Sequence, residues 1–215
     1  ECQGLTLGLL ICEDMWTSNF YQKDAVKLLK EKVDKEKLDL DAVINLSASP
    51  FTQGKVQKRI ARSKAISNLL KAPFIYVNRV GGEDEILFDG QSLIVDGSEE
   101  KLLLKGFNKD EQTWEYSKSG DYSDGKEALR ENTWEELFSA RIDKETSSLK
   151  ALTSEECEEL IEAMCFGVQE YARKSGFNKF TIALSGGMDS ALVLTLLRLS
   201  LKEGQYLEAI YMPSV

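Results

Sequence analysis

The stretch Phe180-Thr-Ile-Ala-Leu-Ser-Gly-Gly-Met-Asp-Ser190 decides the fold of the C-terminal part of this 215-residue chain. Its first five residues are suited to a buried strand, and a helical pattern follows the glycines to about Leu201. Gly204, which we expect to end that helix, precedes a second apolar run at Leu207–Met212. The order strand, glycine loop, helix, strand predicts a βαβ unit with parallel strands and a right-handed crossover.

The loop between this strand and this helix has the features of a phosphate site. Free amides and the dipole at a helix start favour an anion, and adjacent glycines let the backbone approach it closely. A Walker loop requires Lys, and a dinucleotide fingerprint requires GxGxxG, so neither motif fits. Asp189 can orient the loop or hold a magnesium ion that bridges to phosphate. The predicted ATP-binding residues are Ser185, Gly186, Gly187, Met188, Asp189 and Ser190, with Asp189 as the metal ligand.

The sequence pattern of the N-terminal part predicts alternating strands and helices followed by a β meander. Apolar runs separated by helical patterns indicate strands and helices in alternation. The expected strands are Leu5–Ile11, Asp41–Leu46 and Pro73–Asn78, and the expected helices are Tyr21–Glu36 and Gly54–Leu70. Gly81-Gly82 and Asp89-Gly90 indicate turns. Short strands are expected at Ile86–Phe88, Gln91–Val95 and Leu102–Leu104, with Asp96-Gly97 as a tight hairpin turn.

A second domain is expected to begin after a polar connection at about residues 142–152. Thr153 and Glu156 have the spacing of a capping box, and Gly176 is placed to end the helix that follows. Cys157 and Cys165 fall within this helix, and we expect both to pack as small apolar residues. The predicted domains are therefore residues 1–145 and 146–215.

Composition excludes several classes of function. The 36 acidic residues outnumber the 27 basic ones, which disfavours a nucleic-acid partner. No run of about 18 apolar residues is present to span a membrane. The four cysteines form no CxxC motif, which indicates a reducing, cytoplasmic setting. The chain contains no histidine, so Cys-His and Ser-His catalysis built from these residues is excluded.

Cys12 follows the first predicted strand within Leu10-Ile-Cys-Glu-Asp-Met-Trp16. A side chain at the end of a strand can project into a site that a rigid sheet supports. Glu13 and Asp14 disfavour a thiolate, so a nucleophilic Cys12 requires a Lys elsewhere or a Glu that accepts its proton. Taken alone, a cysteine here is also consistent with a small buried side chain.

The C-terminal motifs resemble those of a known group of ATP enzymes. Ser185–Ser190 is similar to the SGGxDS loop of the adenine nucleotide alpha-hydrolase-like group, which cleaves ATP to AMP and pyrophosphate. Residues 180–193 together with Ala209–Ser214 resemble the NAD synthetases in particular. The resemblance implies the start of a Rossmann-like domain that uses ATP and Mg²⁺.

The N-terminal motifs resemble the nitrilase superfamily, whose triad is Glu, Lys and Cys. Residues 11–16, 45–59 and 77–92 together look like the glutaminase domain of NAD synthetases, which implies part of an α-β-β-α sandwich. By this resemblance Cys12 is the nucleophile that attacks glutamine. Asp84 and Glu85 could bind the substrate amino group or pair with Arg59, and Arg79 could be a structural ion-pair partner. The implied glutamine-binding residues are Glu13, Trp16, Ser47, Ser49, Arg59 and Glu85.

The resemblance implies a ligase that amidates deamido-NAD with ammonia from glutamine, releasing AMP and pyrophosphate. Its expected partners are glutamine, deamido-NAD and ATP, with no nucleic acid or membrane, in a homo-oligomer. In the family the Glu and Lys usually precede the Cys by more than the eleven residues present here. We therefore expect an internal fragment that is inactive alone.

Two other hypotheses remain open at the level of sequence. The first is a different glutamine-fed ligase with an SGGxDS loop, such as a relative of GMP synthetase, although its usual Cys-His-Glu glutaminase conflicts with the absence of histidine. The second is a non-catalytic assembly module that retains the fold.

Overall fold

The computed structural model describes residues 4–16, 23–116, 121–123 and 151–211. The chain divides into two compact units, which are described separately. The first contains residues up to Val80 and Phe88–Ala151, and the second contains Gly81–Leu87 and Leu152–Val215. Residues 142–150, where we expected a domain boundary, lie outside the described residues, so the boundary remains a prediction.

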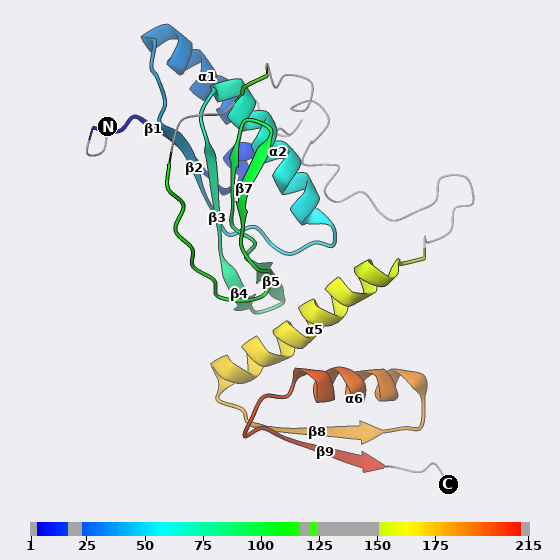
Figure 1. Cartoon of the computed structure of the whole chain (residues 1–215). Coiled ribbons are helices and arrows are strands. Elements are labelled where there is room, and N and C mark those ends of the chain that lie inside the picture. Colours follow the sequence, from blue (N-terminus) through cyan, green and yellow to red (C-terminus); the bar gives the residue numbers. More distant parts are fainter. Residues whose placement is uncertain (1–3, 17–22, 117–120, 124–150, 212–215) are drawn as a thin grey trace. The chain divides into compact units, whose positions relative to one another are not determined.

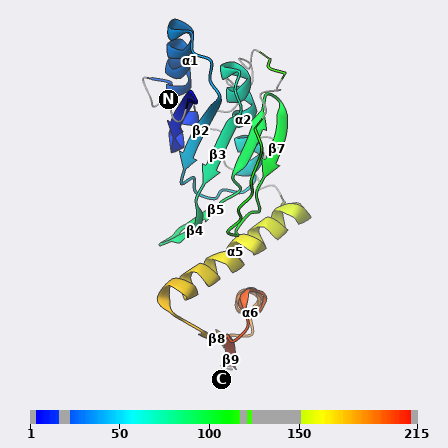
Figure 2. The same ribbon diagram turned by 60° about the vertical axis from the view of Figure 1, so that its left-hand side comes forward.

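The first unit is built on a five-stranded sheet with the order β1-β2-β3-β6-β7 (Figures 1 and 2). The first three strands are parallel, and β6 and β7 are antiparallel to their neighbours. This arrangement confirms the predicted αβ section and hairpin. The strands are β1 (Leu7–Ile11), β2 (Ala42–Ser47), β3 (Phe74–Asn78), β6 (Leu93–Asp96) and β7 (Glu99–Leu103).

Two helices share one hydrophobic core with this sheet. Helix α1 (Ala25–Glu36) begins at the cap Asp24, and α2 (Lys55–Leu70) begins after Gly54 in a left-handed conformation. Their apolar side chains pack with those of the strands because alternate strand residues point to the helix side. On the opposite face of β1, Leu9 and Ile11 are exposed.

The meander differs from the prediction in one respect. Strand β4 (Val80–Glu83) was not expected, and it pairs with β5 (Ile86–Asp89) in a separate two-stranded sheet. Gly81-Gly82, which we interpreted as a turn, lies within β4, whereas the turn falls at Asp84 and Glu85. Val80 supplies a side chain with a strong strand preference, and the small glycines allow close packing of the hairpin.

The second unit confirms the predicted βαβ unit. Strands β8 (Lys179–Leu184) and β9 (Tyr206–Tyr211) are parallel and are joined through α6 (Met188–Ser200). Helix α5 (Ser154–Ser175) packs against α6, which lies between α5 and the strands in Figure 1. None of the helices in the described part of the chain has the length and apolarity needed to cross a membrane.

The ends of α5 match the prediction, and two other predictions were wrong. Thr153 and Glu156 form the capping box, and Gly176 is the left-handed C-cap. Cys157 is exposed, so it does not pack in a core, whereas Cys165 is half-buried. Helix α6 ends at Ser200, four residues before Gly204, because a turn at residues 202–205 separates them.

Gly97 permits a test of the β6–β7 turn. Its backbone is left-handed, and an added Cβ would lie 2.5 Å from the carbonyl oxygen of Asp121. Left-handed backbone costs an L-residue about 1–2 kcal/mol, and the clash adds to that cost. Gly97→Ala should therefore destabilise the protein more than Gly54→Ala, which is also left-handed but has open space. Equal losses in chemical denaturation of both variants would contradict this geometry.

Candidate functional site

Cys12 lies in a strained turn at the carboxyl end of β1. Its φ of +49° is left-handed, a conformation that side chains other than glycine rarely adopt and that often marks a functional site. Cys12 begins the short 3-10 helix η1 (Cys12–Met15), and its side chain is half-buried. The carboxylate of Asp14 accepts a hydrogen bond from the Ile11 amide at 2.8 Å, which fixes the entry to this turn.

Arg59 is the centre of a buried polar cluster near the ends of β2 and β3. Its side chain is fully buried, and its terminal nitrogens donate to both carboxylate oxygens of Asp89 at 2.7 and 2.9 Å. The guanidinium also donates to the Ser49 hydroxyl at 3.3 Å. The suggestion that Asp84 or Glu85 pairs with Arg59 was therefore wrong. Those two residues form the exposed turn of the β4–β5 hairpin, where charged groups remain hydrated.

Lys55 is a buried cation that the predicted site did not include. Only 2% of the residue is exposed, and its ammonium donates to the carbonyl oxygen of Pro50 at 3.0 Å. Burial and the nearby Arg59 charge lower its pKa to about 8, against the opposing effect of Asp89, Cys12 and Glu13. Helix α2, which begins at Lys55, packs against η1, which begins at Cys12. The sequence signal was its position one residue after Gly54, at the first turn of α2.

The other predicted glutamine residues differ in burial. Ser49 is buried, and its amide donates to the side chain of Asn78 at 2.9 Å. Ser47 and Glu13 are half-buried, whereas Trp16 is 5% exposed and belongs to the hydrophobic core. The structure thus brings Ser49 and Arg59 into direct contact and uses Trp16 in packing.

Arg79 was considered as an ion-pair partner and is placed against an aromatic ring. Its guanidinium carbon lies 4.7 Å from the centroid of the Phe88 ring, a distance typical of a cation–π contact. The amide of Gly90 donates to the carbonyl oxygen of Arg79 at 3.0 Å. Arg79 thereby helps to fix the segment that carries Asp89.

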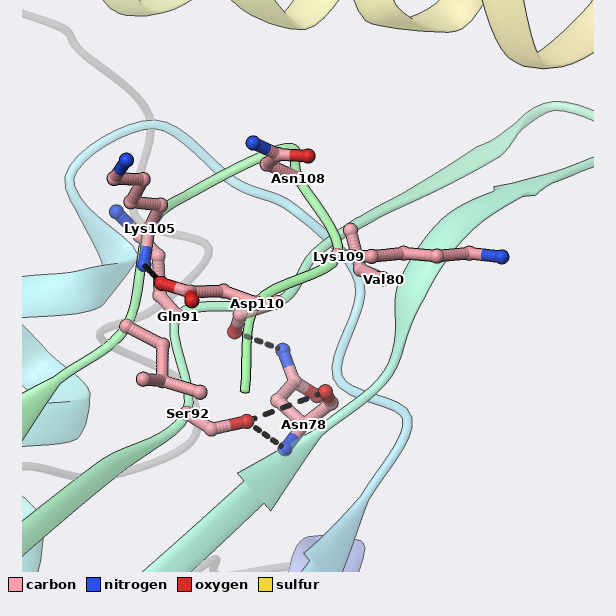
Figure 3. Close-up of a pocket in the computed structure, with 10 residues that line it drawn as sticks. Asn78, Val80, Gln91, Ser92, Lys105, Asn108, Lys109 and Asp110 are labelled. Atoms are coloured by element: carbon pink, nitrogen blue, oxygen red, sulfur yellow. Dashed lines mark hydrogen bonds between the residues drawn. The ribbon is translucent and has the colours of Figure 1, made fainter. Parts of the chain in front are cut away.

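A small hollow of about 160 Å³ is lined in part by Asn78 (Figure 3). The Ser92 hydroxyl accepts a hydrogen bond from the backbone amide of Asn78 at 2.9 Å and donates to its backbone carbonyl oxygen at 3.4 Å. The ammonium of Lys109 points away from Asn78 in this view. The polar groups shown here therefore mainly brace Asn78, which in turn holds Ser49.

The loop from Ser185 to Gly187 joins β8 to α6 and is open to solvent. Gly186 is left-handed with φ +82°, which a β-carbon would strain. Ser185 Oγ accepts from the Gly187 amide at 3.3 Å, and Ser190 Oγ donates to the Gly187 carbonyl oxygen at 3.0 Å. No side chain caps α6 at Gly187, so the first amides of the helix are available to an anion.

Asp189 lies in the first turn of α6, where its carboxylate would repel a bare phosphate. No group of three or more acidic or cysteine side chains that could hold a metal occurs in the described ranges. A magnesium ion here would therefore need ATP oxygens together with Asp189. Mg²⁺ commonly takes one or two carboxylates and completes its shell with phosphate and water.

The family comparison first identifies the class of the C-terminal part. Residues 160–215 match the family model described as NAD synthase. These residues contain the glycine loop and the βαβ unit, so the match and the geometry concern the same element. The chain is thus an α/β protein whose residues 160–215 are similar to the NAD synthase family.

Relatives extend the similarity to the N-terminal part. The chain is 30% identical to the glutamine-dependent NAD(+) synthetase of Acinetobacter baylyi over 91% of its length, and 34% identical to that of Synechocystis over 89%. It spans about three tenths of the length of these relatives, 30% and 31% respectively. The chain is therefore similar, over most of its own length, to a section of the glutamine-dependent NAD(+) synthetases.

A solved structure supports the same conclusion. The glutamine-dependent NAD+ synthetase from Acinetobacter baumannii in complex with ADP matches 99% of the chain and 34% of its own, with a TM-score of 0.68 and 28% identity. The enzyme from Cytophaga hutchinsonii, at 21% identity and a TM-score of 0.56, shows the shared fold alone. The α/β fold class predicted from the sequence is confirmed.

The Arg59–Asp89 pair gives a direct test of the N-terminal cluster. Asp89→Asn should lower the free energy of unfolding by about 3–5 kcal/mol, because it leaves a buried guanidinium without its counter-charge. Asp34→Asn, which breaks the surface pair with Lys30, should cost about 0.5 kcal/mol or less. Similar losses for the two variants in urea denaturation would contradict a buried, stabilising role for Asp89.

Proposed function

We propose that the protein is a glutamine-hydrolysing NAD synthase. It would amidate deamido-NAD with ammonia taken from glutamine and would convert ATP to AMP and pyrophosphate. The observation that carries the proposal is the presence of two different sites on one chain. One is a strained cysteine beside a buried cationic cluster, and the other is an uncapped glycine loop at a helix start.

At the N-terminal site, Cys12 Sγ would attack the side-chain carbonyl carbon of glutamine. The C–N bond then breaks, ammonia leaves after gaining a proton, and a glutamyl thioester remains. Water would hydrolyse this thioester to glutamate and restore the thiol. The family resemblance assigns proton transfer to a Glu and a Lys that precede the cysteine.

The buried charges suggest how glutamine would be oriented for this attack. Lys55 is a cation close to Cys12 and suits the α-carboxylate of glutamine, with the buried Ser49 as a hydrogen-bonding neighbour. Glu13 is half-buried beside the cysteine and suits the α-ammonium group. Ser47 would contribute a hydroxyl at the end of β2. Trp16 would act through packing and Arg59 through its bond to Ser49, whereas Glu85 would act at the surface.

At the C-terminal site, the backbone amides of Gly186, Gly187 and Met188 and the hydroxyls of Ser185 and Ser190 would hold the ATP phosphates. Mg²⁺, when bound through Asp189 and phosphate, would neutralise charge on the departing pyrophosphate. The carboxylate of deamido-NAD would attack the α-phosphorus, and ammonia would then displace AMP from the adenylate. We further propose that the protein is cytoplasmic, in keeping with its cysteine usage, and homo-oligomeric, as the resemblance implies.

A variant at Cys12 separates the two half-reactions. Cys12→Ala should abolish NAD formation from glutamine and leave formation from ammonium chloride at the wild-type rate. Asp189→Ala should lower both rates by about tenfold or more, because both require ATP activation. Equal loss of the ammonia-driven and glutamine-driven rates in Cys12→Ala would argue against this division of chemistry, as would a glutamine-driven rate that survives.

The lowered pKa of Lys55 predicts a dependence on pH. The ammonium is charged below pH 8 and loses its proton above it, so the KM for glutamine should rise above about pH 8. In Lys55→Arg the side chain remains charged, and the alkaline rise in KM should disappear. The measurement is KM for glutamine between pH 6.5 and 9.5, with the KM for ATP as the control (a range chosen around the pKa of about 8). Identical glutamine profiles in the two proteins would remove Lys55 from this role.

A non-catalytic assembly role is less well supported. Such a module has no need for left-handed backbone at Cys12 or for a buried ammonium on the neighbouring helix α2, since both features cost stability. A glutamine-dependent ligase that amidates a different acceptor is tested in the same ammonia-driven assay. Such an enzyme would convert another carboxylate or oxo acceptor and would leave deamido-NAD unchanged.

A further inference from the structure

The turn that carries Cys12 is attached at both ends to side chains from other elements. The first carbonyl oxygen of η1, that of Cys12, accepts a hydrogen bond from Asn45 Nδ2 at 3.3 Å. The last carbonyl oxygen, that of Met15, accepts a hydrogen bond from Arg62 Nε. Asn45 belongs to β2 and Arg62 to α2, so residues 33 and 47 positions away in sequence hold a four-residue turn.

Asn45 is an unusual side chain for its position in the sheet. It lies opposite Leu10 of β1 and Tyr76 of β3, on the helix-covered face, and it is fully buried. Its Oδ1 atom has no hydrogen-bond partner in the described part of the chain. Burying an amide with one end unsatisfied costs stability, so the bond made by Nδ2 is the feature that accounts for an Asn here.

Arg62, which binds the other end of the turn, is also buried at a cost in stability. The residue is fully buried, and burial lowers its pKa to about 10, partly offset by the charge of Asp24. Lys55, Arg59 and Arg62 are spaced by four and three residues, so all three buried cations lie on one face of α2. Arg59 reaches Asp89, whereas Arg62 reaches the backbone of η1.

We propose that Asn45 and Arg62 are positioning residues that hold η1 in place and thereby keep Cys12 in its left-handed conformation. Their hydrogen bonds to the turn go to its backbone carbonyl oxygens. A left-handed Cys costs about 1–2 kcal/mol relative to a relaxed backbone, so the turn needs outside contacts to persist. The inference rests on the proposed role of Cys12 as a nucleophile, and it names the residues that orient the cysteine.

The test replaces Asn45 by Leu, which has a similar shape and no donor. Because the unsatisfied Oδ1 is removed as well, the variant should fold, and Asn45→Ser provides a second, smaller replacement. In the intact protein, both should lower kcat for glutamine-driven synthesis by about tenfold or more, because small displacements of a reacting group are costly. The KM for glutamine should change less than twofold, and ammonia-driven synthesis should be unaffected.

A second readout does not depend on glutamine. Iodoacetamide labelling, followed by mass spectrometry of the Cys12 peptide, should slow by about tenfold in both variants, since the released turn no longer holds the thiol in its present position. The exposed Cys157 of the same protein is the internal reference and should react at an unchanged rate. If Cys12→Ala keeps its glutamine-driven rate, Cys12 is not the nucleophile. The labelling rates would still decide separately whether Asn45 positions Cys12.

Asn68→Leu is the matched control. Asn68 is also a buried Asn of this unit, but it bonds to Lys64, Ser98 and Ser123 and not to η1. It should lose stability and keep both kcat and Cys12 labelling. Folded Asn45 variants with wild-type kcat and labelling would overturn the proposal, and so would an equal loss of both in Asn68→Leu.

Arg62 is tested by a conservative pair of variants. Arg62→Lys, which keeps a donor, should retain more activity than Arg62→Met.

Discussion

The guanidinium of Arg59 is completely buried and donates to both oxygens of Asp89, at the point where α2 meets the end of β5. The same group donates to Ser49, and Asn78 binds both Ser49 and Asp89. Two loops that are distant in sequence are thereby fixed against one helix. The N-terminal site depends on this pair, because the helix that carries Arg59 also carries Lys55 and Arg62 towards Cys12.

The two candidate sites are built in different ways. The glycine loop is local: its hydrogen bonds join Ser185, Gly187 and Ser190, and its anion-binding capacity comes from the backbone of α6. The cysteine site is assembled from η1, strand β2 and helix α2, and its conformation is imposed by contacts across 33 to 47 residues. A local loop tolerates changes elsewhere in the fold, whereas the cysteine site requires an intact α2.

This difference explains what could be predicted from the sequence. Strand and helix periodicity and the caps Thr153 and Gly176 are local signals, and the structure confirms them. The partner of Arg59 was missed because Asp89 and Glu85 are both acidic residues near a turn, and only the register of β4–β5 decides which is buried. Lys55, Asn45 and Arg62 carry no signal beyond their place in a strand or helix, since their importance comes from the packing of α2 on η1.

The central claim is that one protein produces ammonia at the cysteine site and consumes it at the glycine-loop site. The most direct measurement supplies the intact protein with glutamine labelled with ¹⁵N in its side-chain amide, together with ATP, Mg²⁺ and deamido-NAD. Mass spectrometry of the product then reports the origin of its carboxamide nitrogen. The account predicts that NAD carries ¹⁵N in the carboxamide. NAD without the label, or no conversion of deamido-NAD with either glutamine or ammonium, would contradict it.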